Sequence, residues 1–419
     1  MSFLSSLNFF KSDLLLAGLI LAAAAAVLAL PLLYALDRKG FARAASDPTR
    51  VGYTVLAFLG VVLALAAFLG NRAGSANMPL YGRFLGAGFH ILLLANLFVY
   101  VPMLLTVVLP KAGAVALAAY REGWRQPLFW LLTLFGAFAT WISVVLPYFT
   151  FGDDFKMMKQ IGFDIIMFVS LLFGALAASI SIAEEIEGRT AITVMSKPIN
   201  RRSFLIGKFL GILMACAAMS LVLQVNLNFA LVVAPEFDQI NLDRSFDPMP
   251  EQAKAGTVPA VQALMPRGPA RLAAEGIGKW AGEAFAHSFG ILLGFGQVMI
   301  LVAVATALAT RLPFVVNLVV VLFIYFFGHL APVIVRVTDA KPGVDRSTGE
   351  GLVRFLAKLF DTLLPSLEFF NMGPAIIRDT TLDLWAFVTY VITVFLYSVI
   401  YTVIALIVGL LLFEDRDLA

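Results

Sequence analysis

The stretch FDIIMFVSLLFGALAASISIA–EEIEGRTAITVMSKPINRRSFLIGK–FLGILMACAAMSLVLQVNLNFALVVAP occupies residues 163–235, with its charged middle part running from Glu184 to Lys208. Two apolar runs, 163–183 and 209–235, flank this charged part. Each run reaches the length of about 20 apolar residues that a helix needs to cross a lipid bilayer. The stretch therefore predicts two membrane-spanning helices joined by a short charged connection.

The composition of the whole chain agrees with this prediction. Of its 419 residues, 61% are hydrophobic and only 14% are charged, and the mean hydropathy is +0.92. A soluble domain carries about 25% charged residues. The net charge of +3 is small, and the basic residues lie in the connections, so no nucleic-acid partner is expected. We predict an all-α, polytopic helical membrane protein.

Hydropathy predicts about nine spans, the first three in an N-terminal extension, residues 1–110, and the last six in a core, residues 128–419. The spans are predicted at 14–36, 51–70, 84–109, 128–150, 163–183, 209–235, 286–309, 312–335 and 385–413. Two long polar segments, 236–285 and 336–384, interrupt the core. Much of 240–270 is rich in proline, glycine and alanine, so we expect a loop there, followed by a helix near 269–285.

The distribution of lysine and arginine predicts the orientation, because short cytoplasmic connections carry an excess of these residues. With nine alternating spans, one side holds Arg38, Lys39, Arg43, Arg50, Lys111, Arg121, Arg125, Arg189, Lys197, Arg201, Arg202, Arg311 and Arg416. The short connections on the other side hold only Lys11, Arg72, Arg83, Lys156 and Lys159. The N-terminus is therefore expected outside and the C-terminus in the cytoplasm.

Residues 111–127, KAGAVALAAYREGWRQP, are too polar for a span. In a helix, Tyr120 and Trp124 share one face, and Arg121 and Arg125 share another. Aromatic residues beside arginines favour a helix lying in the membrane interface. An ordinary amphipathic connector remains the alternative.

Catalytic motifs are mostly absent from the sequence, and no catalytic residue is predicted. A phosphate-binding P-loop requires G-x-x-x-x-G-K-[ST]. Gly207-Lys208 comes nearest, but Arg202 occupies the position of the first glycine and Phe209 follows the lysine. We therefore expect the chain itself to bind no ATP and no other cofactor.

The sequence does not favour a metal site. The chain has a single cysteine, Cys216, within an apolar run, which rules out a cysteine cluster. His90, His287 and His329 each lie in or near a different span. Packing between helices is the favoured interpretation of these histidines.

Polar side chains inside spans are costly in a bilayer and therefore informative. Asp164 lies near the predicted end of its span, and no acid lies near mid-membrane, which disfavours ion-coupled transport. Among the amides, Gln224 and Asn228 share a helix face, and Asn317 lies in another span. These three are candidates for lining a translocation path, although hydrogen bonding between helices is the favoured alternative.

The charged segment 184–208 shows the signals of a short helix. Ile192 and Met195 would give that helix an apolar face, and Pro198 would end it. Asn200 is a good N-cap for the span that follows. Such a helix, held between two spans, is suited to receive force from a cytoplasmic partner; a loop that only carries positive charge is the alternative.

This segment resembles one in permease subunits of ATP-binding-cassette transporters of the second exporter class. There an acidic pair precedes a Gly/Thr turn and the pattern S-K-P-x-x-R-x-x-F-L-x-G-K. The matching residues here are Glu184, Glu185, Gly188, Thr190, Ser196, Lys197, Pro198, Arg201, Phe204, Leu205, Gly207 and Lys208. Segment 111–127 is similar to the family's elbow helix, and the resemblance covers roughly residues 111–419. One departure is the order Gly188-Arg189, because the family more often places the arginine first.

The resemblance implies a multi-pass subunit of an exporter in a bacterial cytoplasmic membrane. ATP and Mg would bind to a separate ATPase subunit, and a second permease, identical or related, would complete the path through the lipid membrane. The residues expected to couple to the ATPase are Glu184, Glu185, Ile186, Arg189, Thr190, Ile192 and Met195. Swapping Arg189 or Ile192 for Glu would then abolish transport.

Two other functions stay open at this point. A membrane enzyme would place its chemistry in segments 236–285 and 336–384, which contain Asp243, Asp247, Glu251 and Glu368 in no paired spacing. A scaffold or assembly factor would recruit a membrane partner through residues 1–110.

Overall fold

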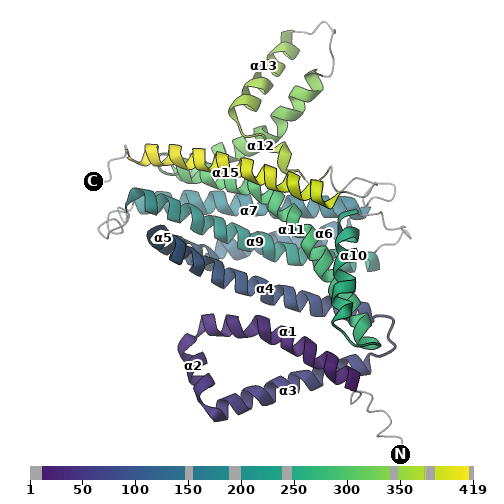
Figure 1. Cartoon of the computed structure of the whole chain (residues 1–419). Coiled ribbons are helices and arrows are strands. Elements are labelled where there is room, and N and C mark those ends of the chain that lie inside the picture. Colours follow the sequence, from purple (N-terminus) through teal and green to yellow (C-terminus); the bar gives the residue numbers. More distant parts are fainter. Residues whose placement is uncertain are drawn as a thin grey trace, which may run out of the picture. The chain divides into compact units, whose positions relative to one another are not determined.

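The computed structural model describes residues 12–146, 154–187, 200–237, 248–339, 348–371, 373 and 383–414 (Figure 1). All regular structure in these ranges is helical. The elements are α1 Ser12–Leu36, α2 Arg38–Ser46, α3 Pro48–Asn71, α4 Met78–Val108, α5 Pro110–Arg125, α6 Pro127–Val145, α7 Asp154–Glu187, α9 Arg201–Phe237, α10 Pro248–Ala263, α11 Pro269–Leu308, α12 Phe314–Asp339, α13 Thr348–Leu363, the short 3₁₀ helix η2 Glu368–Phe370, and α15 Leu384–Glu414.

The predicted spans are confirmed in the described ranges, where nine helices are long and apolar enough to cross a membrane. They are α1, α3, α4, α6, α7, α9, α11, α12 and α15. The chain is an all-α polytopic membrane protein, as its composition predicts.

Several spans begin well before their predicted first residues, among them α9, which begins at Arg201 whereas the hydropathy predicts residue 209. Helix α7 begins at Asp154, and its apolar part extends over Phe155–Ile182, whereas the hydropathy predicts residues 163–183. Asp164 consequently lies inside a membrane-spanning helix. Helix α11 continues without a break from Pro269 to Leu308.

The prediction of a loop over 240–270 is wrong for residues 248–263, which form α10. Pro248 and Pro250 lie in the first turn, where proline costs no hydrogen bond. The helix packs closely on α11: a Cβ on Gly278 would lie 2.7 Å from the Cα of Val258. Thr257 also donates a hydrogen bond to the carbonyl of Gly278 at 2.8 Å. Tertiary packing thus overrides the weak local preference of this segment.

The chain divides into two compact units, with boundaries inside α4, inside α11 and between residues 246 and 247. The first unit comprises residues 1–101 and 247–288. Its core joins the N-terminal helices to the first half of α11 through Leu14, Ala17, Leu21, Ala66, Leu69, Met78, Ala270, Ala273 and Ile277. Asp37 and Asp47 cap the helices α2 and α3 that follow them.

A partly buried ion network holds three helices of the first unit together. Glu283 of α11 accepts from Arg83 of α4 at 3.0 Å and from Lys254 of α10 at 3.1 Å. Gly82 and Gly276 have no room for a side chain, since a Cβ on either would meet backbone atoms of the facing helix. Residues 248–288 are therefore an integral part of the unit that contains the N-terminal spans.

The second unit comprises residues 102–246 and 289–419. The apolar windows of α7 and α9 are 72% and 61% buried, against 22% for both α12 and α15. Helices α7 and α9 are thus central, and α12 and α15 present apolar side chains outward. Ser170 and Ser220 are hydrogen-bonded at 2.8 Å between α7 and α9.

Helix α5 packs along α9 through small residues. A Cβ on Gly207 would lie 2.6 Å from the carbonyl oxygen of Ala112, and one on Gly211 would lie 2.5 Å from that of Ala116. Further along, Gly123 faces Ala215. Small residues spaced by four let the two helix backbones approach closely.

Candidate functional site

Four residues meet where α7 ends and α9 begins, and we call Glu122, Ser181, Glu185 and Lys208 the stem cluster. Lys208 of α9 is 4% exposed. Its ammonium donates to Glu185 at 2.6 Å and to Ser181 at 2.8 Å, both on α7. Glu122 of α5 lies 3.5 Å from the same nitrogen. The stem cluster therefore joins both helices that flank residues 188–199 to α5.

Arginines at the same end of the bundle bind the C-terminus of α15. Arg201 donates at 2.8 Å to the carbonyls of Phe413 and Glu414, and Arg311 donates at 2.8 Å to that of Leu412. The last carbonyls of a helix lack intrahelical donors and carry partial negative charge. These arginines supply the missing donors and fix the end of α15 beside the first turn of α9.

An apolar cluster lies under these polar contacts. It consists of Val115, Ile182, Phe204, Ala309 and Phe413, all buried. The rings of Phe204 and Phe413 lie 6.0 Å apart. One residue comes from each of α5, α7, α9, α15 and the segment after α11, so five parts of the chain are packed together at this end.

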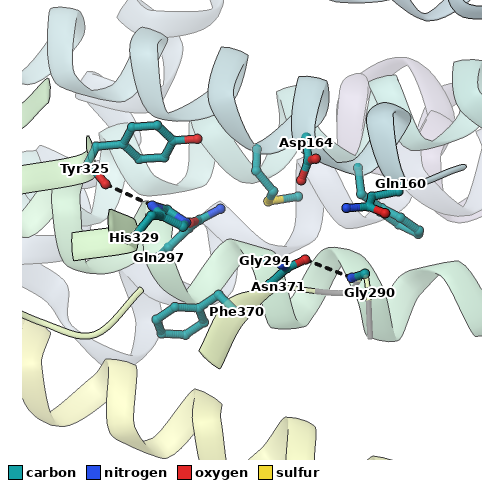
Figure 2. Close-up of a pocket in the computed structure, with 12 residues that line it drawn as sticks. Gln160, Asp164, Gly290, Gly294, Gln297, Tyr325, His329, Phe370 and Asn371 are labelled. Carbon is teal, nitrogen blue, oxygen red and sulfur yellow. Dashed lines mark hydrogen bonds between the residues drawn. The ribbon is translucent and has the colours of Figure 1, made fainter. Parts of the chain in front are cut away.

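The second unit also contains a cavity of about 270 Å³, toward the other end of α7 (Figure 2). Its lining comes from α7, α11, α12 and the segment around η2. The lining residues are Gln160, Phe163, Asp164, Met167, Gly290, Gly294, Gln297, Tyr325, His329, Phe370, Asn371 and Gly373. Figure 2 shows Asp164 and Gln160 pointing from α7 toward Asn371 and Gly294, with Tyr325 and His329 of α12 beside them.

Some of these polar groups already have partners within the lining. His329 Nδ1 lies 2.9 Å from the carbonyl oxygen of Tyr325. Asn371 Oδ1 accepts from the backbone nitrogen of Gly373 at 2.8 Å. The Oε1 atom of Gln297, by contrast, is buried and has no hydrogen-bond partner among the described residues.

The predicted coupling residues lie at or beyond the C-terminal end of α7. Glu184, Glu185 and Ile186 belong to its last turns. Arg189, Thr190, Ile192 and Met195 fall outside the described residues. Of this set, the structure shows one side-chain partner of Glu185, which is Lys208.

The predicted interfacial segment is a helix, α5, over Pro110–Arg125. Tyr120 is buried, and burial raises the pKa of its phenol to about 12. Trp124 packs its ring 5.0 Å from that of Phe129, while Arg121 and Arg125 are exposed. The position of α5 in a membrane interface stays a prediction.

The predicted path residues are buried inside the second unit. Gln224 and Asn228 are at most 1% exposed on α9. Asn317 donates at 2.9 Å to Ser179 of α7 and to the carbonyl of Ala305. Asn317 thus ties helices together, as the structural alternative proposes, and the cavity lining includes none of the three. Their role in a translocation path stays a prediction.

The sequence reasoning missed the cavity, although its residues follow a regular spacing. Gln160 and Asp164 are four residues apart on α7, as are Tyr325 and His329 on α12. Gly290, Gly294 and Gln297 continue the pattern on α11. Such spacing places each set on one helix face. Three such faces on three spans are the pattern from which the sequence could have indicated the cavity.

The nine long apolar helices found among the described residues define a polytopic membrane protein. Residues 148–418 match the family model described as "ABC-2 family transporter protein", and the chain belongs to this family. No significant match was found among the curated proteins or the solved structures compared with the chain. Family membership supports a permease role, in which the chain is a membrane subunit of a transporter.

Proposed function

We propose that the chain is the permease of an ATP-driven exporter in a bacterial cytoplasmic membrane. A separate ATPase subunit binds ATP and Mg and docks on segment 184–202. The N-terminus lies outside and the C-terminus in the cytoplasm, as the charge bias predicts. A second permease, identical or related, completes the path through the lipid bilayer.

One observation carries this proposal: the 2.6 Å ion pair between Glu185 and Lys208 joins the two helices that enter and leave segment 188–199. A partner that displaces this segment moves α7 and α9 together, and α5 follows through Glu122 and the glycine contacts. Switching requires that the nucleotide states of the ATPase contact the segment differently. The stem cluster supplies the stiff connection that such a partner needs.

The test is purification of the chain from its native membrane in mild detergent, with mass spectrometry of the bound proteins. We expect a stoichiometric ATPase, and we expect Arg189→Glu or Ile192→Glu to reduce its recovery about tenfold or more, because charge reversal or burial of a charge in an interface costs several kcal/mol. Arg43→Glu is the matched control, since Arg43 is an exposed arginine on the same predicted side.

Two results contradict the proposal. One is a reproducible complex that contains no ATPase. The other is normal recovery and normal stimulated ATP hydrolysis in both loop variants. Native mass spectrometry of the same sample determines whether two permease copies, or this chain and a related one, are present.

A further inference from the structure

We propose that the cavity between α7, α11, α12 and the η2 segment is a binding site for a protonated primary amine. The site goes beyond the proposed coupling function and does not depend on it, because every lining residue belongs to this chain. The inference rests on the charge, the hydrogen-bonding capacity and the shape of the lining.

The charge of the lining is negative. Among the described residues that line it, Asp164 is the only carboxylate, and none is a lysine or arginine. Within the described part of the chain Asp164 forms no ion pair, and it is exposed where it lines the cavity. A carboxylate within a membrane-spanning helix is costly unless it is compensated. Because the Asp164 side chain is open to the cavity, a cation bound there reaches the carboxylate and supplies this compensation.

Three acceptors of the lining are available to a cation, beside the amide and phenol donors of Gln160, Gln297, Asn371 and Tyr325. The buried Oε1 of Gln297 lacks a donor. His329 Nδ1 faces a carbonyl oxygen, which can only accept, so this nitrogen is the one that carries hydrogen. The Nε2 atom of the neutral ring is then an acceptor. An alkylammonium group has three donors and no acceptor, and therefore complements Asp164, Gln297 and His329.

The remaining lining suits the organic part of such a ligand. Phe163, Tyr325 and Phe370 contribute aromatic rings, and Met167 contributes a polarizable thioether. Aromatic faces attract cations, and the thioether packs well against apolar groups. Glycines at 294 and 373 let the helix and the η2 segment approach the cavity closely: a Cβ on Gly294 would lie 2.8 Å from the sulfur of Met167, and one on Gly373 would lie 3.0 Å from Gln160 Nε2.

The size of the cavity favours a small organic cation over an inorganic one. Its volume of about 270 Å³ is close to the lower end of small-molecule sites, about 300 Å³. A site for a bare metal ion gathers several ligands around one point. The described residues contain no group of three or more His, Cys, Asp or Glu side chains that would hold a metal ion.

The test uses the purified full chain in lipid nanodiscs without any ATPase. Equilibrium binding is measured at neutral pH for benzylammonium and for benzyl alcohol, a neutral compound of the same shape, with empty nanodiscs as the blank. We expect benzylammonium to bind about tenfold more tightly or better, because only the cation compensates Asp164. Asp164→Asn is expected to remove this preference. Asp361→Asn, which changes an exposed acid of α13 outside the lining, is expected to keep it.

Three results overturn the proposal. The first is equal binding of the two compounds to the wild-type chain, which needs no variant and holds even if Asp164→Asn fails to fold. The second is a benzylammonium preference that survives Asp164→Asn. The third is an Asp164-dependent thermal stabilisation by sodium chloride alone, which identifies an inorganic cation as the occupant. Because no ATPase is present, failure here leaves the coupling proposal untouched, and failure of coupling leaves this one untouched.

Discussion

The two ends of the helical core differ in whether their polar groups have partners. At the end with the stem cluster, Lys208 contacts two carboxylates and a hydroxyl, and Arg201 and Arg311 satisfy the last carbonyls of α15. At the cavity end, Asp164 has no ion pair among the described residues, and Gln297 Oε1 has no hydrogen-bond partner there.

This difference separates residues that stabilise the protein from residues available for binding. Paired charges and capped helix ends lower the free energy of the folded chain and make its local structure stiff. Polar groups left without partners cost stability and persist at sites where they serve a function. Changes at the first end should therefore reduce the free energy of unfolding, and changes at the second should reduce ligand binding.

The largest loss is expected for Lys208→Met. Removing the ammonium leaves Glu185 and Glu122 without their common partner inside the bundle. Breaking a buried ion pair costs about 3–5 kcal/mol, and the partial exposure of both acids reduces this to about 2–4 kcal/mol. Unfolding of the purified chain in mixed micelles with increasing SDS measures the change.

The matched control is Lys111→Met, which removes an exposed lysine of α5 and should cost less than about 0.5 kcal/mol. A second substitution, Glu185→Gln, tests the cause of the loss. It should cost much less in the Lys208→Met background than alone, since the pair is already broken. Equal costs in both backgrounds would show that the pair does not stabilise the stem.

A somewhat smaller loss is expected for Gly211→Ala, at the contact between α5 and α9. Its new Cβ would lie 2.5 Å from the carbonyl oxygen of Ala116, so the helices must separate. Overpacking of this kind costs about 1–3 kcal/mol. The same SDS titration applies.

Gly60→Ala in α3 is the control for this substitution, since nothing lies within 4 Å of a Cβ there. Alanine favours a helix over glycine by about 1 kcal/mol, so this variant should be as stable as the wild type or more so. A similar loss of stability in both variants would mean that Gly211 is not required for the close packing of α5 against α9.

Substitutions of two neighbouring arginines separate the capping of α15 from a surface ion pair at the same end. Arg201→Met removes two hydrogen bonds to the end of α15 and the contact with the Phe413 ring, so we expect a loss of about 1–2 kcal/mol. Arg202→Met removes an ion pair with Glu414 in which Arg202 is 69% exposed, and should cost less than about 1 kcal/mol. Loss of equal size in both would contradict the capping role of Arg201.

The sequence predicts the spans well, because long apolar runs are local features that nothing else in the chain alters. It misses the first turns of α7, since the residues DFKMMKQIG are too polar for a hydropathy window to include. It also misses α10, whose helical form depends on packing against Gly278 and Gly282 of α11.

The sites are harder to predict than the spans for a related reason. Lys208 is prominent in the sequence, but one partner, Glu122, lies 86 positions away. The spacing of Gln160 and Asp164 indicates a shared helix face, yet only the three-dimensional structure brings this face against His329 and Asn371. Contacts between distant segments require the tertiary arrangement, which local patterns do not contain.

The smallest effect on stability is expected for Asp164→Asn. The amide has nearly the shape of the carboxylate, and among the described residues Asp164 has no ion pair to lose. The free energy of unfolding should therefore stay within about 0.5 kcal/mol of the wild type, or rise, since a charge within the membrane is removed. The SDS titration measures this change beside Lys208→Met. A loss above about 2 kcal/mol would reveal a structural partner for Asp164, and the contrast between a stabilising end and a binding end of the core would no longer hold.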